Sequence, residues 1–270
     1  MRLFVPVPLQ AGSEISLPPG PARHAQVRRV QPGDVLQLFD GSGSDWPATV
    51  LAVGRSEVRV AVGAAVPVQR ELPRRVTLAL AMPANERMDA LVEKATELGV
   101  AAVQPLMSSR SVLRLSGERA QRKQQHWQAI AEAACEQCGR AQVPVVSAVQ
   151  ELSAWLAGLP RADGSTRLLL SLQPDALPLS VLVPLLVPVL VPVLVPVLVP
   201  VLAPVLVPPG AAPLWTLSGP EGGLTPDEEA AARAAGFLPA ALGPRVLRAD
   251  TAPLAVLAWL GLAHSAAVQG

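Results

Sequence analysis

Two glycine-bearing segments near the C-terminus have the residue types and spacing that best suit ligand binding. They are residues 218–225, SGPEGGLT, and residues 242–251, LGPRVLRADT. Glycine permits backbone conformations and close approaches that other residues resist, so these segments favour loops that wrap a ligand over packed elements. Either segment alone would also fit an ordinary turn between a strand and a helix. The pair together predicts a binding site.

A helix is predicted to follow each glycine segment. Thr225 suits the N-cap of the first helix, Pro226 suits its first helical position, and Glu228 completes a capping box. The N–H groups at the start of this helix then face the glycine segment. Asp250 and Thr251 can cap the last helix, whose body is largely apolar.

An α/β domain is predicted for the residues that position these segments. Apolar runs and helical periodicity alternate in a β-α-β order, which is typical of a sheet covered by helices. The predicted order is a strand at 76–81, a helix at 85–98 closed by Gly99, a strand at 101–106, a helix at about 118–140 and a strand at 143–146.

The N-terminal residues predict a smaller all-β domain. Short apolar runs alternate with turn residues, and the sequence DGSG at 40–43 between two runs is a hairpin signal. The polar, proline-bearing stretch 67–75 marks a boundary. We therefore expect a β-barrel or sandwich over residues 1–70 and an α/β domain over residues 74–268.

Composition excludes some classes of function. The chain has 270 residues, 50% of them hydrophobic and 16% charged, which suits a globular protein of one large or two ordinary domains. The formal net charge of +1 is not that of a strongly basic nucleic-acid binder, so any RNA contact must come from local arginine clusters. The first residues do not resemble a secretory signal, so we expect a cytoplasmic protein with no membrane association.

The cysteines Cys135 and Cys138 form a C-x-x-C, which suits a redox pair or half of a zinc site. The histidines are scattered and no second such pair exists, so no metal site is expected. Both cysteines fall in a helical pattern with Ala131 and Ala134, where small thiols pack as apolar residues.

A low-complexity block at residues 181–209 repeats Val-Leu-Val-Pro within the second domain. Its length and lack of charge suit a membrane span, but a proline every four residues removes a backbone donor from each turn and breaks a helix. We expect an extended or polyproline-like insertion that is dispensable for function, with an apolar interaction patch as the alternative.

Three further segments accompany the two glycine segments. They are His24 with VRRV at 27–30, Gly33-Asp34 and Phe39-Asp40-Gly41; VEKATELGV at 92–100 with PLMSSRSV at 105–112; and residues 127–140, which contain ACEQCGR, with Val143-Pro144. In this order and spacing, the five segments resemble the RsmE family of 16S ribosomal RNA uracil-N3 methyltransferases. The resemblance covers nearly the whole chain apart from the repeat.

The resemblance implies a PUA-like β-barrel for RNA and a SPOUT-type α/β domain with a C-terminal trefoil knot. It also implies S-adenosylmethionine as the cofactor, 16S ribosomal RNA or the small ribosomal subunit as the partner, and a homodimer with the cofactor pocket at the subunit interface. The implied activity is methylation of the N3 of a specific uridine. The alternatives are a catalytically idle RNA-binding or ribosome-assembly protein, and a methyltransferase for a different RNA base.

The resemblance also indicates site residues. The implied cofactor pocket is lined by Leu217, Gly219, Gly222, Gly223, Leu242, Gly243, Leu247 and Arg248. Because N3 must lose its proton and the base then carries negative charge, a carboxylate and a guanidinium suit the reaction. The candidates are Glu221 and Asp250 as carboxylates, and Arg110, Arg140 and Arg248 as cations.

Arginines outside the glycine segments are candidates for contacts with RNA phosphates. Those of the first domain are Arg2, Arg23, Arg28 and Arg29; a second group at 114–123 suits a solvated helix face equally well. One residue and one segment depart from the family pattern: Asp250 stands where the family usually has glutamate, and residues 170–174 lack the asparagine or histidine often seen there.

Overall fold

The computed structural model describes residues 1–160, 163–179, 181–182 and 212–268. The predictions for the repeat at 181–209 therefore fall almost entirely outside the described residues. The chain divides into two compact units, Met1–Glu71 with Ala131–Val143, and Leu72–Ile130 with Pro144–Gly270.

The first unit is built on a six-stranded mixed sheet with the order β1-β3-β4-β5-β2 and β6 paired to β4. Strands β1 and β3 are parallel, and the other pairs are antiparallel. Alternate side chains of the central strands are buried and form one core with Leu36, Val50 and Val60. The strands are β1 (Arg2–Phe4), β2 (Glu14–Ser16), β3 (Val35–Phe39), β4 (Ser44–Val53), β5 (Val58–Val62) and β6 (Val66–Pro67).

The hairpin predicted at residues 40–43 joins β3 and β4, with Phe39 paired to Asp45. Gly41 and Gly43 adopt φ values of +87° and +98°, which favour glycine. Helix α1 (Pro19–Val27) is absent from the prediction. Its prolines fall in the first turn, where backbone N–H groups lack partners within the helix anyway.

The second unit contains an eight-stranded sheet with the order β10-β8-β7-β13-β11-β14-β12 and β9 paired to β8. Every pair is parallel, and four successive residues of β7, Leu78 to Ala81, are buried, as expected for a parallel sheet covered on both faces. The predicted α/β class is therefore confirmed. The strands are β7 (Val76–Ala81), β8 (Ala102–Met107), β9 (Val145–Val146), β10 (Gln150–Glu151), β11 (Thr166–Leu170), β12 (Leu177–Pro178), β13 (Leu214–Ser218) and β14 (Leu238–Ala241).

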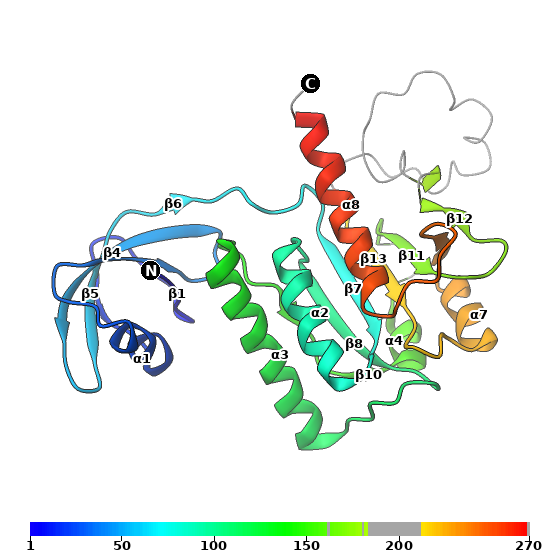
Figure 1. Cartoon of the computed structure of the whole chain (residues 1–270), viewed down its shortest axis with the longest axis horizontal. Coiled ribbons are helices and arrows are strands. Elements are labelled where there is room, and N and C mark those ends of the chain that lie inside the picture. The colour runs from blue at the N-terminus through cyan, green and yellow to red at the C-terminus, as the bar shows by residue number, and fades with distance from the viewer. Residues whose placement is uncertain (161–162, 180, 183–211, 269–270) are drawn as a thin grey trace. The chain divides into compact units, whose positions relative to one another are not determined.

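Four of the helices, α2 with α8 and α4 with α7, pack in two pairs against this sheet (Figure 1). Helix α2 contacts α8, which also contacts β13, while α4 contacts α7 and β8. No helix in the described part of the chain is long and apolar enough to cross a membrane. The trefoil knot stays a prediction. The helices are α2 (Asn85–Glu97), α3 (Gly117–Cys138), α4 (Leu152–Gly158), α7 (Pro226–Ala234) and α8 (Thr251–Val268).

Candidate active site

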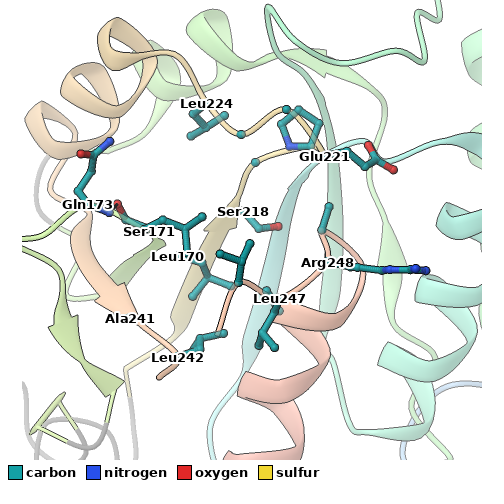
Figure 2. Close-up of a pocket in the computed structure, with 18 of the residues that line it drawn as sticks. Leu170, Ser171, Gln173, Ser218, Glu221, Leu224, Ala241, Leu242, Leu247 and Arg248 are labelled. Atoms are coloured by element: carbon teal, nitrogen blue, oxygen red, sulfur yellow. Dashed lines mark hydrogen bonds between the residues drawn. The ribbon is translucent and has the colours of Figure 1, made fainter. Parts of the chain in front are cut away.

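A cavity of about 740 Å³ opens where the carboxyl ends of β11, β13 and β14 meet (Figure 2). These three strands are parallel neighbours, so the loops that follow them emerge at one edge of the sheet. Residues 170–173, 218–224 and 240–249 form most of its walls. The structure therefore brings both glycine segments to one cavity.

Most of the predicted site residues line this cavity. They are Arg110, Gly219, Glu221, Gly222, Gly223, Leu242, Gly243, Leu247 and Arg248. Leu170, Leu242 and Leu247 give it an apolar wall (Figure 2). Leu217 is not part of the lining, because it is fully buried within β13, where it pairs with Ala79 of β7.

The first glycine segment folds back tightly on itself. A Cβ added to Gly219 would lie 2.9 Å from the nitrogen of Leu224 and 3.0 Å from the carbonyl carbon of Gly223. The N–H of Gly223 donates to the oxygen of Pro220 at 2.8 Å, and Gly223 has a φ of +67°. Only glycine fits at position 219 without a shift of the backbone.

The capping box predicted for α7 is present. Thr225 Oγ1 accepts a hydrogen bond from Glu228 N at 3.2 Å, and Glu228 Oε2 accepts one from Thr225 N at 2.8 Å. Glu228 Oε1 also accepts a bond from Ser109 N at 2.7 Å. Burial alone would raise the pKa of Glu228, but these donors outweigh it and hold the pKa below its ordinary value. Glu228 thus ties the loop after β8 to the glycine segment.

Arg110 holds the same segment from its side. Its Nη1 donates to the oxygen of Gly222 at 2.8 Å and to the oxygen of Leu224 at 3.3 Å. Its side chain runs along Gly222, where an added Cβ would lie 3.4 Å from Arg110 Cβ. The Arg110 guanidinium therefore stabilises the conformation of the loop 219–224.

Glu221 is held by groups at the start of α2. Its Oε1 accepts hydrogen bonds from Arg87 Nη1 at 2.9 Å and from Ala84 N at 3.2 Å. Arg87 also lines the cavity. Sequence reasoning misses Arg87, because it precedes Glu221 by 134 residues and belongs to no glycine segment.

Arg248 and Arg245 are exposed cations of the second glycine segment. Neither forms an ion pair or a side-chain hydrogen bond with the described residues. Arg248 and Glu221 lie on one side of the cavity, and Ser171 and Gln173 lie on the other (Figure 2). A second carboxylate that sequence reasoning misses, Glu229, lines the cavity and lies 3.4 Å from the hydroxyl of Ser171.

Asp250 does not line the cavity, although its neighbour Ala249 does. Its Oδ1 is buried and accepts no hydrogen bond from the described residues. The N–H groups of Thr251 and Ala252 instead donate to the carbonyl of Arg248 at 3.0 Å. This Asp250 oxygen therefore does not cap α8 as predicted.

Two arginines with predicted functional roles are engaged elsewhere in the first unit. Arg140 is only 3% exposed and its Nε donates to Glu71 Oε1 at 3.0 Å. Arg2 pairs with Asp45 at 2.8 Å and its guanidinium lies 3.7 Å from the centre of the Phe39 ring. Neither residue lines the cavity. These contacts support structural roles rather than a catalytic role for Arg140 or RNA contacts for Arg2.

The other predicted RNA contacts, Arg23, Arg28 and Arg29, are exposed in and just after α1. Cys135 packs with Phe39 and Ala141 in a buried cluster, as the helical pattern predicts. Burial raises the pKa of the Cys135 thiol to about 12, so it is not a reactive thiolate.

Comparisons with known proteins agree with this architecture. A family model described as RNA methyltransferase domain matches residues 70–183 and 198–261, and a model described as RNA methyltransferase PUA domain matches residues 22–62. The chain therefore belongs to the family of RNA methyltransferases that carry an N-terminal PUA domain. This membership confirms the PUA-like first domain and the resemblance found in the sequence.

Individual relatives indicate a narrower class of RNA methyltransferase than the family models do. Ribosomal RNA small subunit methyltransferase E from Synechocystis is 34% identical over 86% of this chain and 67% of its own length, and that from Bacillus subtilis is 29% identical over 86% and 82%. A solved ribosomal RNA small subunit methyltransferase E from Neisseria gonorrhoeae, bound to S-adenosylmethionine, is 33% identical over 96% of each chain with a TM-score of 0.79. A Legionella pneumophila structure described as a methyltransferase with bound cofactor SAM is 30% identical over 97% of each chain with a TM-score of 0.81.

Proposed function

We propose that this protein transfers the methyl group of S-adenosylmethionine to the N3 of a specific uridine in 16S ribosomal RNA. One observation carries the proposal: both glycine segments wall a single cavity at the carboxyl edge of the parallel sheet. The relatives described as ribosomal RNA small subunit methyltransferases support it, and so do the two similar structures that hold the cofactor.

The cavity suits a cofactor that carries an adenosine. The backbone at Gly219 comes so close to Gly223 and Leu224 that a Cβ at position 219 would clash with it, so the loop along the cavity wall needs glycine there. Backbone N–H and C=O groups of such loops bond well to a base and a ribose, while the leucine wall suits a flat ring. The proposed cofactor residues are Gly219, Gly222, Gly223, Leu242, Gly243, Leu247 and Arg248, with Leu217 behind the wall in β13.

When bound, S-adenosylmethionine supplies an electrophilic methyl group on a sulfonium. The N3 of uridine must give up its proton as the new N–C bond forms, and the base carries negative charge on the way. Arg248 is exposed beside the cavity without an ion pair among the described residues, so it suits stabilisation of that charge. The sequence suggests Glu221 and Asp250 as proton acceptors, but Asp250 does not line the cavity and Glu221 Oε1 already accepts hydrogen bonds from Arg87 and Ala84.

The exposed Arg23, Arg28 and Arg29 are proposed to bind phosphates of the RNA, which fix its position on the first unit. We also propose a cytoplasmic homodimer with a knotted second domain. The dimer and the knot are proposed from the family resemblance.

Titration calorimetry of the purified protein with S-adenosylmethionine tests the enzymatic role. We expect saturable binding and a rise in melting temperature with cofactor concentration. Absence of both at millimolar cofactor would contradict an enzyme and would favour the idle RNA-binding protein. Cofactor binding without N3-methyluridine in the product RNA would point to a different base.

A further inference from the structure

We propose that Arg87 is a positioning residue, which acts through Glu221 to hold the glycine loop 219–224 in the shape that binds the cofactor. The inference rests on the proposed methyltransferase function. It starts from the ion pair between Arg87 Nη1 and Glu221 Oε1 at 2.9 Å, whose side chains are 38% and 33% exposed. Both residues line the cavity.

The same oxygen of Glu221 caps helix α2. Ala84, the N-cap residue of α2, offers no side-chain cap, and its N–H donates to Glu221 Oε1 at 3.2 Å. The positive end of the helix dipole favours a carboxylate at this place. Glu221 is therefore held in place by Arg87 and by a backbone N–H at the start of α2.

The loop needs such anchors because of its composition. Residues 219–224 include three glycines, which lose more conformational freedom on ordering than other residues do. Arg110 holds the carbonyls of Gly222 and Leu224, and Glu228 holds the end of the loop. Arg87 fixes the side of the loop that faces α2. Without Arg87, the loop would lose conformational entropy only when the cofactor binds, and this loss would weaken the affinity.

An anchoring role makes Glu221 unsuited to be the proton acceptor. Its Oε1 already accepts hydrogen bonds from a guanidinium and a backbone N–H, so this oxygen is engaged in holding the loop. Loss of either partner should then weaken cofactor binding, while the rate of methyl transfer at saturating cofactor should change little. Loss of a true general base would instead lower kcat by about a hundredfold or more.

The test compares Arg87→Met, Glu221→Gln, the double variant and Arg87→Lys with the wild type. Lys94→Met is the matched control, because Lys94 lies on the same helix in an exposed ion pair with Glu93 and Glu97 and does not line the cavity. Calorimetry gives the Kd for S-adenosylmethionine, methylation assays give kcat and KM, and melting curves without cofactor show that each variant folds.

We expect each single variant to raise Kd and KM for the cofactor by about three- to tenfold, with kcat kept within about twofold. The double variant should be no worse than the singles, Arg87→Lys should restore part of the affinity, and Lys94→Met should match the wild type. A wild-type Kd in Arg87→Met, additive effects in the double variant, or a collapse of kcat in Glu221→Gln would overturn the proposal. A wild type that binds no cofactor would instead refute the proposed function itself.

Discussion

Gly219 shows how a single residue type can set the shape of a loop that lines the cavity. The sequence predicts that Gly219 lies in a loop, because glycine destabilises helices and strands. The reason for it is visible only in three dimensions, where the backbone of Gly223 and Leu224 occupies the space of a Cβ.

Substituting Gly219 by alanine should impair cofactor binding more than folding. The new Cβ would meet backbone atoms at 2.9–3.1 Å, so the loop must shift. We expect a cost of about 1–3 kcal/mol, or roughly 5- to 150-fold in cofactor affinity. Gly158→Ala is the control, since a Cβ there meets nothing within 4 Å. Equal cofactor affinities of the two variants by calorimetry would refute the assigned role of Gly219.

Ion pairs between residues far apart in the sequence could not be predicted from the sequence alone. Arg140 qualifies by type and position as a cation for catalysis, but it is buried against Glu71. Arg87 carries no motif, yet it pairs with Glu221 across 134 residues. Such pairs depend on which elements become neighbours in the fold, and a single sequence does not encode that in local spacing.

At the scale of elements, local signals were reliable where the stabilising groups are close in sequence. The strand at 76–81 and the capping box of α7 agree with the prediction, because alternation and N-caps depend on neighbours within a few residues. The sequence does not predict helix α1, since nine residues with two early prolines give a weak helical signal.

Glu228 should make stability depend on pH through the capping box. Its pKa is lowered in the folded protein, so the ionised carboxylate stabilises the fold above the ordinary pKa of glutamate. That contribution is lost as the pH falls through the lowered pKa. Glu228→Gln should therefore be less stable than the wild type by about 1 kcal/mol at neutral pH and equally stable well below about pH 4. Urea unfolding at both pH values measures this.

Asp227→Asn provides the control for Glu228, because it removes one negative charge from the same first turn of α7. It should lose less stability than Glu228→Gln at neutral pH. A Glu228→Gln deficit that persists unchanged in acid would show that the carboxylate charge is not what stabilises this end of the helix.

The end of α1 offers a test of strain in the first unit. Arg29 has a φ of +57° at the position after the helix, where its N–H donates to Gln26 and that of Val30 donates to Ala25. Glycine usually occupies this position, since a side chain there is strained. Arg29→Gly should stabilise the protein by up to about 1 kcal/mol and weaken RNA binding.

Arg28→Gly is the matched variant, because Arg28 has an ordinary φ of −80°. It should also weaken RNA binding but should not gain stability. Urea unfolding and RNA binding assays on both variants separate strain from function. A loss of stability in Arg29→Gly would contradict the strain at this position.

At the scale of the whole molecule, we propose that the unit with the mixed sheet binds RNA and that the unit with the parallel sheet binds the cofactor. The class of each unit follows from its pattern of apolar runs, and the comparisons place them in a PUA domain and an RNA methyltransferase domain. The knot and the dimer have no signal in composition or periodicity, because both concern how distant segments or separate chains meet. They stay predictions from the family resemblance.

Deleting residues 183–206, most of the Val-Leu-Pro repeat, should leave methylation and dimerisation intact. Lengthening a loop costs little in loop-closure entropy. Among the described residues, the cavity is lined by segments before and after the repeat in the sequence, at 170–173 and 218–224, and these segments remain in the shortened protein. Sedimentation and methylation assays of the shortened protein provide the measurement. Loss of the dimer or of activity would give the repeat a structural or functional role.

The central claim is tested most directly by incubating the purified protein with S-adenosylmethionine and small ribosomal subunits from a strain that lacks it. Mass spectrometry of the digested 16S ribosomal RNA then identifies the modified nucleoside. We predict N3-methyluridine at a single position that is unmodified before incubation. The appearance of no methylated nucleoside, or of a methyl group on another base, would contradict the account.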